Sequence, residues 1–410
     1  MAVNKTRVVI ALSGGVDSSV AAYLLKKKGY DVIGIFMKNW HDESVTVSKE
    51  CPWLEDSYDA MIVSEKISIP FQTVDLSVDY QKRIVDYMFN EYERGNTPNP
   101  DILCNREIKF DVFLKIALKL GADFIATGHY CRVKKTRKNN QDYFSLFQGF
   151  DKNKDQSYFL CQLSQAQLSK TIFPIGELTK KEVRLIAKKE GLVTAEKKDS
   201  QGLCFIGKVK LPDFLQQKLK PKKGKIVKIP HDSKIYFETD LKNTSYKNLF
   251  NISKSYNYSF SDGEYIADHS GAHFFTVGQR KGLAVGGTKE PLFVLKTDVL
   301  ENIIYVGEGK EHPGLFRKTL FINQKDLHFI RKDFFLKKES PFKVKARIRY
   351  RQPLQSALLF LVDNGAFLIF DKKQSAITKG QFAVWYKGQE LLGSGAVSYT
   401  HLTLPTIYSV

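Results

Sequence analysis

Two cysteines, Cys104 and Cys204, stand in sequence contexts where a thiol could react. Residues 97–110 read TPNPDILCNREIKF, a proline-containing stretch that leads into a predicted helix, and Cys104 falls near the start of that helix. A helix N-terminus and the nearby Arg106 both favour the thiolate, the nucleophilic form of cysteine. Cys204 follows EKKDSQGL, whose lysines, serine and glycine indicate an exposed turn. From spacing alone, the two cysteines are either a functional pair or ordinary structural residues.

The other three cysteines carry weaker signals. Cys161, in SYFLCQL, lies on an apolar stripe and is expected in the core, while Cys51 and Cys131 are expected to be structural or incidental. The chain contains no C-x-x-C pair, which argues against a zinc ribbon or a clustered iron–sulfur site. An odd and sparse set of cysteines is typical of a reduced, cytoplasmic protein.

A glycine turn at residues 12–19, LSGGVDSS, predicts an anion site. Gly14 and Gly15 let the backbone approach a phosphate, and the free N–H groups of the helix that follows point at it. Asp17 among the serines makes sense if it holds Mg²⁺. The ATPase pattern G-x-x-x-x-G-K-[ST] is absent, because no lysine follows the glycines. The alternative is a tight strand–helix turn in which Ser and Asp only cap the helix.

The first two hundred residues alternate between strands and helices, which predicts a Rossmann-like, doubly wound parallel sheet. Expected strands are 7–12, 31–37, 71–75 and 123–127, and expected helices are 17–28, 56–67, 78–92 and 105–120. Ligands of such sheets bind at the carboxyl ends of the strands. The glycine turn follows the first strand, so the sheet positions it there.

The alternation of strands and helices ends near residue 210, and we expect three more segments after this first domain. Residues 1–210 form the nucleotide-binding catalytic domain, and 211–288 a central domain with a basic linker (218–225) and a polar insert (229–262). Short alternating strands predict an antiparallel β-barrel over 289–397. The last segment, 398–410, has no charged residue in a chain that is 26% charged, so we interpret it as a non-native tail.

The chain has a formal net charge of +19, which favours a polyanionic partner, with nucleic acid ahead of an anionic membrane. The alternative is a lysine-rich, solvated surface. No run of about 18 apolar residues is present, so we expect no membrane association.

The sequence resembles a known family. SGGVDSS is similar to the signature of the PP-loop ATP pyrophosphatases, and the whole set of motifs resembles the tRNA-specific 2-thiouridylases. The matching stretches span residues 7 to about 395 and are SGGVDSS, GNTPNPDILCNREIKF, ATGHY, KDQSYFL, KKDSQGLCFIG, VGQRKGL and RIRYRQ.

The resemblance implies ATP-dependent thiolation of tRNA at the wobble uridine, position 34. ATP with Mg²⁺ would adenylate the C2 oxygen, and sulfur would arrive as a persulfide on Cys204 from a cysteine desulfurase or a sulfur-relay protein. Cys104 would be the partner nucleophile and close a transient disulfide with Cys204, and Asp101 would act as acid/base or orient the base. The implied enzyme is a monomer that binds the anticodon arm of tRNA.

The resemblance also implies which residues bind the two substrates. Those for the nucleotide are Ala11, Leu12, Ser13, Gly14, Gly15, Val16, Asp17, Ser18, Met37 and Gly128, with Asp17 as the Mg²⁺ ligand. Those for the tRNA are Asn99, Pro100, Asp101, His129, Lys154, Asp155, Gln156, Arg349, Tyr350 and Gln381. Because Arg347, Arg349 and Arg351 alternate, we expect them on one strand face.

Two departures from the family pattern are visible. Lys379 stands where the family usually has proline, and the polar insert is longer than in typical members; its lysines could extend the RNA track or contact a sulfur donor. Two other functions stay open on the sequence. One is a PP-loop enzyme that adenylates a carboxylate or carbonyl for amidation, and the other is a non-catalytic RNA-binding protein.

Overall fold

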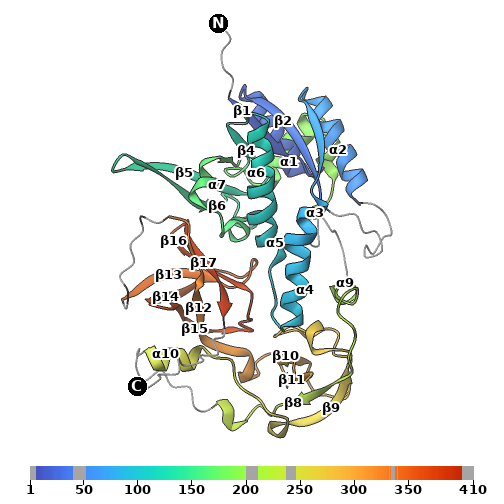
Figure 1. Ribbon diagram of the computed structural model, residues 1–410, viewed down its shortest axis with the longest axis vertical. Helices are drawn as coiled ribbons and strands as arrows, with labels where there is room; N and C mark the ends of the chain where they lie inside the picture. Colours follow the sequence, from blue (N-terminus) through green and yellow to red (C-terminus); the bar gives the residue numbers. More distant parts are fainter. Residues whose placement is uncertain are drawn as a thin grey trace, which may run out of the picture.

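The computed structural model describes residues 6–39, 52–199, 211–236, 246–331, 333, 338 and 340–398. Cys51 and Cys204 lie outside these residues. The chain builds three units, a parallel-sheet domain, a small middle domain and a β-barrel, joined along a central helical column (Figure 1).

The first unit is an all-parallel five-stranded sheet in the order β3-β2-β1-β4-β7. Its strands are β1 (Arg7–Ala11), β2 (Asp31–Lys38), β3 (Phe71–Asp75), β4 (Phe124–Ala126) and β7 (Thr171–Ile172). The chain turns outward through β2 and β3 and then returns to the other side of β1. The switch point of the sheet therefore lies between β1 and β4, where such folds bind their ligands.

Helices cover both faces of this sheet, which confirms the doubly wound prediction. Val8 and Ile10 of β1 pack with α1 (Val16–Lys27), α2 (Pro52–Lys66) and α8 (Lys180–Lys189). Val9 and Ala11 face the other way, because side chains alternate along a strand. There they pack with α3 (Ser77–Tyr80), α4 (Asp86–Glu93), α5 (Pro100–Leu103) and α6 (Phe113–Lys119).

Two of the predicted helices contain π-helical turns, η2 (Gln81–Val85) and η3 (Cys104–Val112), and each joins its α-helical neighbours into one column. The remaining short elements of this unit are η4 (Ser157–Leu160), α7 (Gln165–Ser169) and η5 (Val193–Glu196). None of the helices in the described ranges is both long and apolar enough to cross a membrane.

A hairpin that was not predicted from the sequence leaves the first unit and joins the barrel. It consists of β5 (Cys131–Lys138) and β6 (Gln141–Gln148), connected by Asn139 and Asn140, both at positive φ. Two residues with positive φ make the turn that suits a two-residue hairpin. β6 pairs with the last strand of the barrel, so this hairpin ties the first unit to the third.

The middle unit extends further than expected. Its sheet has the order β10-β11-β8-β9, with strands β8 (Gly224–Lys228), β9 (Glu264–His269), β10 (Leu292–Asp298) and β11 (Ile303–Glu308). The predicted boundary between 288 and 289 is therefore wrong, since β10 and β11 belong to this sheet. The alternation of residues marked both segments as strands, but alternation does not say which strands they pair with.

The described helices of the middle region are α9 (Leu211–Leu215), η6 (Lys234–Tyr236), α10 (Tyr246–Ser253), η7 (Phe260–Asp262), η8 (Ala272–Phe274) and η9 (Pro313–Leu315). Part of the polar insert has a packing role. Leu249 and Phe250 of α10 pack against Phe321 and Phe367 of the barrel, so this helix covers one of its ends. Residues 237–245 of the insert lie outside the described ranges.

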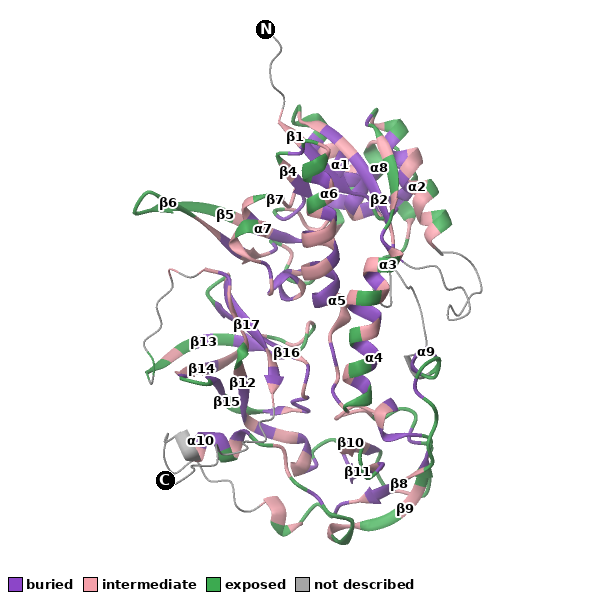
Figure 2. Cartoon of the chain, viewed as in Figure 1, coloured by how far each residue is buried: buried purple, intermediate pink, exposed green. Residues whose placement is uncertain are grey.

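The third unit is a closed antiparallel barrel, as predicted. Its strands are β12 (Phe316–Phe329), β13 (Pro341–Arg347), β14 (Gln355–Val362), β15 (Gly365–Ser375), β16 (Phe382–Lys387) and β17 (Glu390–Ser398), and β12 closes on β17. Figure 2 shows buried residues along these strands, whereas the free end of β5–β6 is exposed. Ser398 pairs with Phe321, so it belongs to the barrel and not to the predicted tail. Residues 399–410 are not described, and their foreign origin stays a prediction.

Candidate active site

The glycine loop is built as an anion cradle at the end of β1. Gly14 has φ +68°, and a Cβ there would lie 2.1 Å from the backbone oxygen of Asp56, so only glycine fits. The N–H of Ser13 donates to Ser18 Oγ at 3.1 Å, and Ser18 Oγ donates to the Gly15 carbonyl at 3.1 Å. These bonds close the loop over the start of α1, where helix N–H groups face an incoming anion.

Gly128 presses on the same helix start from β4. A Cβ at Gly128 would lie 2.6 Å from the backbone nitrogen of Ser18. The two loops that follow β1 and β4 therefore meet at the switch point of the sheet. Ala11 and Leu12, just before the loop, are buried, as are Val16 on α1 and Met37 on β2. The nucleotide-binding roles inferred for these residues stay predictions.

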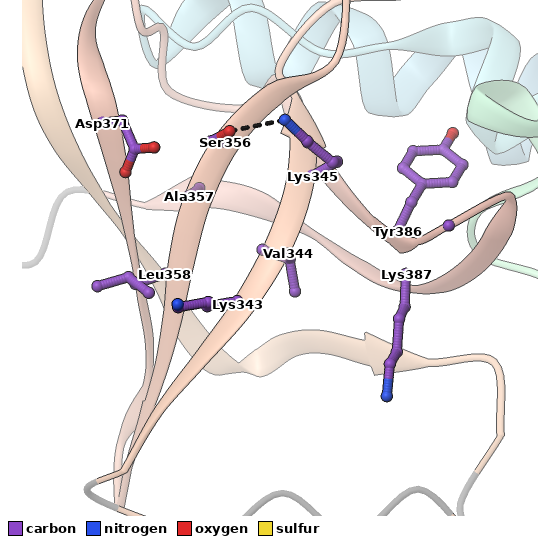
Figure 3. Close-up of a pocket in the computed structure, with 10 residues that line it drawn as sticks. Lys343, Val344, Lys345, Ser356, Ala357, Leu358, Asp371, Tyr386 and Lys387 are labelled. Atoms are coloured by element: carbon purple, nitrogen blue, oxygen red, sulfur yellow. Dashed lines mark hydrogen bonds between the residues drawn. The ribbon is translucent and has the colours of Figure 1, made fainter.

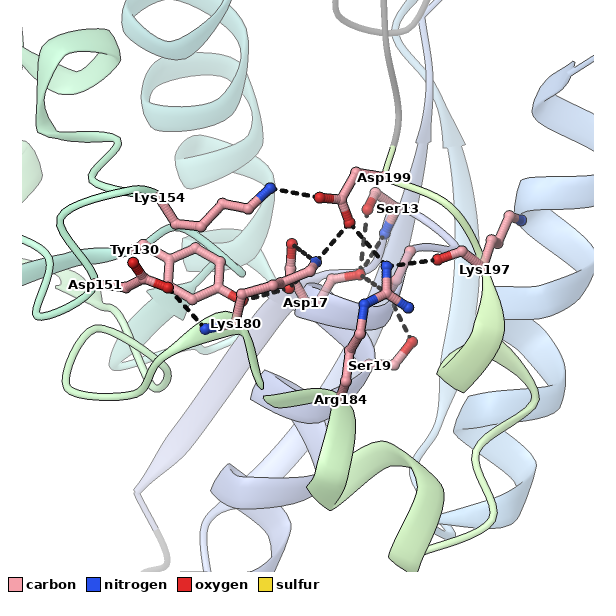
Figure 4. A network of polar contacts seen from close by, with 12 residues as sticks. Ser13, Asp17, Ser19, Tyr130, Asp151, Lys154, Lys180, Arg184, Lys197 and Asp199 are labelled. Atoms are coloured by element: carbon pink, nitrogen blue, oxygen red, sulfur yellow. Dashed lines mark hydrogen bonds and ion pairs between the residues drawn. The ribbon is translucent and has the colours of Figure 1, made fainter. Parts of the chain in front are cut away.

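A lysine from far along the chain reaches the loop. Lys180, the first residue of α8, places its Nζ 2.7 Å and 2.9 Å from the two carboxylate oxygens of Asp17 (Figure 4). The hydroxyl of Tyr130 donates to Asp17 at 2.7 Å, and burial together with the Asp17 charge raises the pKa of this phenol. The cation that the loop sequence lacks is thus supplied by Lys180, whose side chain is only 13% exposed.

Asp199 gathers three cations beside this pair. Its carboxylate accepts from Lys154 at 2.5 Å and from Lys180 at 2.7 Å, and Arg184 lies 3.2 Å away (Figure 4). Burial opposes ionisation, but the hydrogen bonds from Lys154 and Lys180 lower the pKa of Asp199 to about 2. At neutral pH this cluster holds one carboxylate among cations that a phosphate could also engage.

Cys104 lies inside a helix. Asn99 caps the segment by accepting from the N–H of Ile102 at 3.2 Å, and Pro100 occupies the first helical position. Cys104 is the fifth residue from Pro100 and is fully buried in the core between the sheet and the helices. The helix therefore begins one turn earlier than expected, and Cys104 lies beyond its first turn with its thiol covered. Reaction at Cys104 therefore requires access through the surrounding side chains.

The residues next to Cys104 are polar and constrained. Asp101 lies three residues before it, on the same side of the helix. Asn105 is buried and donates through Nδ2 to the Asp101 carbonyl at 2.9 Å. Its Oδ1 has no hydrogen-bond partner among the described residues. A buried acceptor without a partner is costly, and here it marks a place where a ligand donor could fit.

His129 follows Gly128 and packs between two aromatic rings, Phe110 at 6.1 Å and Phe173 at 6.2 Å between ring centroids. Its Nδ1 lies 2.7 Å from the hydroxyl oxygen of Thr127. Burial, with the nearby Lys109 charge, lowers the pKa of His129 well below its usual value. The imidazole is therefore neutral at physiological pH.

The three KDQ residues all make internal contacts. Lys154 binds Asp199, and Gln156 forms hydrogen bonds with both backbone groups of Tyr130 at 3.0 Å and 3.1 Å. Asp155 is buried and pairs with Arg347 at 2.8 Å, their side chains being 2% and 8% exposed. This pair fastens the barrel to the first unit, and tRNA contact by the KDQ residues stays a prediction.

The expectation that Arg347, Arg349 and Arg351 share a strand face is wrong. β13 ends at Arg347, and the other two lie in the turn that follows. Arg347 points inward because Asp155 and the hydroxyl of Tyr386 bind it. Arg349 donates to the Ala376 carbonyl at 2.6 Å. A short-range repeat cannot reveal where a strand ends.

Two predicted tRNA contacts of the barrel lie against the first unit. The ring of Tyr350 packs 4.3 Å from that of Phe159, and Gln381 Nε2 donates to the Thr97 carbonyl at 3.1 Å. The N–H of Thr97 donates to the carbonyl of Lys379 at 2.9 Å. Proline also has this carbonyl, so lysine at 379 keeps the hydrogen bond. The barrel therefore supports the loop that leads to Asn99 and Pro100.

A separate hollow of about 600 Å³ lies on the barrel between β13, β14 and β16 (Figure 3). Lys343, Lys345 and Lys387 line it, and Lys345 donates to Ser356 Oγ at 2.7 Å. None of the residues predicted for the nucleotide or the base belongs to its lining.

Lys180, Arg184 and Tyr130 were not predicted from the sequence, and Asp199 had no predicted role. Tyr130 directly follows the ATGH motif, which is a usable signal. Lys180 follows Thr179, whose side chain and Glu182 form a capping box, but that pattern indicates only a helix start. Within the described ranges, no group of three or more His, Cys, Asp and Glu residues could hold a metal ion by itself.

Three family models match the chain in order. They are the tRNA methyl transferase HUP domain at residues 6–208, the tRNA methyl transferase PRC-barrel domain at 251–308, and the aminomethyltransferase beta-barrel domain at 321–397. The second match ends where β11 ends, which agrees with the sheet seen in the structure.

Relatives match almost the whole chain. The tRNA-specific 2-thiouridylase MnmA of Christiangramia forsetii is 63% identical over 96% of this chain and 100% of its own length. The enzyme of that name from Karelsulcia muelleri is 49% identical over 97% and 100%. Among solved structures, a complex of a 4-thiouridine synthetase with RNA and ATP matches 52% of this chain and 50% of its own, with 18% identity and a TM-score of 0.31, too weak a likeness to argue from. Full-length identity at this level shows that the chain belongs to the tRNA-specific 2-thiouridylase family.

Proposed function

We propose that this chain replaces the C2 oxygen of a tRNA uridine by sulfur in an ATP-dependent reaction, as a tRNA-uridine 2-sulfurtransferase. The observation that carries the proposal is full-length identity of up to 63% to enzymes named for this activity. The geometry agrees with it, because an anion cradle, a set of cations and the Cys104 helix all belong to one domain.

The nucleotide is proposed to bind at the glycine loop. The N–H groups at the start of α1 and the hydroxyls of Ser13 and Ser18 face the phosphates. Lys180 and Arg184 supply positive charge that now rests on Asp17 and Asp199. When a triphosphate binds, it takes over these cations from the carboxylates, because a phosphate offers more charge and more acceptor oxygens.

Asp17 suits a magnesium ion that is held mainly by phosphate oxygens. Mg²⁺ usually takes one or two carboxylates and completes its shell with phosphates and water. Lys180 and Tyr130 both donate hydrogen bonds to the Asp17 carboxylate. If Lys180 moves to the phosphates, the Asp17 carboxylate becomes available to bind the ion. The ion would neutralise phosphate charge, while the protein groups orient the nucleotide.

The proposed chemistry needs two thiols. Adenylation converts the C2 oxygen into part of AMP, a good leaving group. The terminal sulfur of a persulfide on Cys204 attacks C2, AMP leaves, and the Cys104 thiolate attacks the Sγ of Cys204. This attack breaks the sulfur–sulfur bond of the persulfide. The transferred sulfur takes the two electrons of that bond and stays on C2, while Cys104 and Cys204 form a disulfide. Asp101, on the Cys104 helix, is proposed to orient the base or move its proton.

The target is proposed to be the wobble uridine, which leaves its stack to enter the site, as single-stranded loop bases do. Asn99, Pro100 and His129 would line its pocket. A neutral His129 can donate or accept one hydrogen bond without adding charge. The sulfur donor is proposed to be a desulfurase or relay protein, and the enzyme to be a cytoplasmic monomer.

Single-turnover assays of the Cys204→Ser and Cys104→Ser variants test this proposal. Both variants should release pyrophosphate when mixed with ATP and tRNA, because adenylation uses no thiol, and neither should form thiolated tRNA. Thiolation by Cys204→Ser at the wild-type rate would exclude the persulfide mechanism on Cys204. Release of pyrophosphate by the wild type that depends on tRNA but yields no thiolated tRNA would favour an amidating enzyme. An absence of tRNA-dependent pyrophosphate release in the wild type would favour a non-catalytic RNA binder.

A further inference from the structure

The β5–β6 hairpin carries a concentrated positive charge. Residues 131–148 include five basic residues and one acidic residue. The basic residues all lie on β5 and are Arg132, Lys134, Lys135, Arg137 and Lys138. From Lys134 to the turn, every residue of β5 is exposed.

Only the base of the hairpin is anchored. β6 pairs with β17 at Leu146 and Phe147, and Gln165 binds both backbone groups of Phe144. Beyond Phe144 the two strands pair with each other, and the arm projects from the body (Figures 1 and 2). A two-stranded ribbon with no buried face has little stability of its own. Packing within this chain therefore does not explain why the hairpin extends away from the core.

The arm starts at the candidate active site. β5 begins at Cys131, directly after Tyr130, whose hydroxyl binds Asp17. Eight residues at about 3.4 Å each extend the strand by roughly 25 Å from that point. A polynucleotide with one base in the site would have its flanking phosphates within this distance.

Three of the five cations make no ion pair among the described residues. Arg132 pairs with Glu177 and binds Gln389 in the β16–β17 turn, and Lys135 pairs with Asp142. No ion pair joins Lys134, Arg137 or Lys138 to a described carboxylate, although the Lys134 ammonium lies over the ring of Phe147 at 5.1 Å. Unneutralised cations on an exposed ribbon are what a phosphate backbone attracts.

We propose that the distal part of this hairpin binds the phosphodiester backbone of the tRNA, next to the nucleotide held in the site. The inference rests on the proposed function in that it takes the partner to be tRNA. Lys134, Arg137 and Lys138 contact phosphates and carry no base specificity, so they add affinity and orientation.

The five basic residues of β5 could instead have either of two other roles. The experiment below distinguishes both from RNA binding. β5 is an edge strand, and lysines on edge strands prevent pairing with another chain. A basic arm could also dock an acidic protein that delivers sulfur. The reach from the active site and the exposure of three cations that have no ion-pair partner among the described residues favour RNA.

The test is a triple variant, Lys134→Gln, Arg137→Gln and Lys138→Gln, in the full-length chain. Its matched control is Lys26→Gln, Lys27→Gln and Lys28→Gln, three exposed lysines at the end of α1, on the opposite edge of the sheet from the loop. Both variants lose three positive charges. Binding of unmodified tRNA is measured by fluorescence anisotropy over a series of salt concentrations, together with ATP affinity and melting temperature.

We expect the hairpin variant to bind tRNA roughly 10- to 100-fold more weakly near 0.1 M salt, with a log–log salt slope smaller by about two to three. ATP affinity and melting temperature should match the wild type, and the control should bind tRNA nearly as the wild type does.

Unchanged tRNA affinity and slope would overturn the proposal. With new self-association, that result would assign the lysines to edge protection. If tRNA affinity is unchanged but the variant thiolates more slowly with a protein sulfur donor, and at the normal rate with sulfide, the three residues would be assigned to binding of the donor protein. If the wild type fails to thiolate tRNA while the hairpin variant still loses affinity, the proposed function fails and the RNA-binding arm stands.

Discussion

Replacing Asp199 by asparagine should tighten nucleotide binding. The Asp199 carboxylate engages Lys154 and Lys180 at 2.5 Å and 2.7 Å. If a triphosphate takes over these cations, the carboxylate competes with it for the same charge. Asparagine keeps the size of the side chain and removes the competing charge, so the cations become available at less cost.

The size of the effect follows from the acidity of this carboxyl. The hydrogen bonds from the two lysines, set against burial, lower the pKa of Asp199 from 3.8 to about 2. That difference corresponds to an upper limit of about 2.4 kcal/mol of stabilisation. The side chain is 36% exposed, and solvent screening reduces the value to about 1 kcal/mol. We therefore expect about fivefold tighter binding of a non-hydrolysable ATP analogue.

Calorimetric titration of the analogue with Mg²⁺ measures the change. Glu196→Gln is the matched control, because Glu196 pairs with the α8 residue Lys188 at an exposed position. It should leave the affinity unchanged. Affinity that is unchanged or weaker in Asp199→Asn would refute the exchange of partners and show instead that Asp199 holds the lysines in place for the phosphate.

Three further predictions follow from the same structure. Gly128→Ala places a Cβ 2.6 Å from the backbone of α1 and should abolish binding of the ATP analogue. Its control is Gly29→Ala, where φ is +84° and no atom lies within 4 Å of the added Cβ. This variant should lose about 1 kcal/mol of stability in urea unfolding and bind the analogue normally. Arg347→Met removes the ion-pair partner of the buried Asp155 carboxylate, which keeps its hydrogen bonds from Gln148, Gly149 and Ser157, and should cost about 3–5 kcal/mol in urea unfolding; a loss below 1 kcal/mol would contradict the buried pair. Because the folded pKa of Asp199, about 2, lies below its usual 3.8, its stabilisation is full above pH 3.8 and is lost as the pH falls through 2. The stability difference between wild type and Asp199→Asn should therefore be constant from pH 7 to 5 and disappear only below pH 2.

Local patterns were sufficient to predict most of the elements. Runs of apolar residues located β1 to β4, and the glycine turn located the start of α1, because both signals depend on neighbours in the sequence. Sheet membership depends on distant partners. β10 and β11 were assigned to the barrel for this reason, although they pair with β8 and each other. The β5–β6 hairpin was missed because β5 is mostly polar and exposed.

The candidate site likewise contains residues that local patterns predict and residues that they do not. Two glycines, three serines and an acid sit within eight residues, so the anion cradle was predictable. Lys180 stands 163 residues from Asp17, and no local pattern joins them. The alternating arginines were misread because burial of Arg347 is decided by Asp155, 192 residues earlier in the chain.

The central claim is that the chain transfers sulfur to tRNA. Mass spectrometry of nucleosides from tRNA, after incubation with ATP, Mg²⁺, a sulfur donor and the enzyme, tests it most directly. We predict one sulfur in place of one oxygen on the uracil of the wobble nucleoside, present with the wild type and absent with Cys204→Ser. Unmodified tRNA under these conditions, or equal thiolation by Cys204→Ser, would contradict the account.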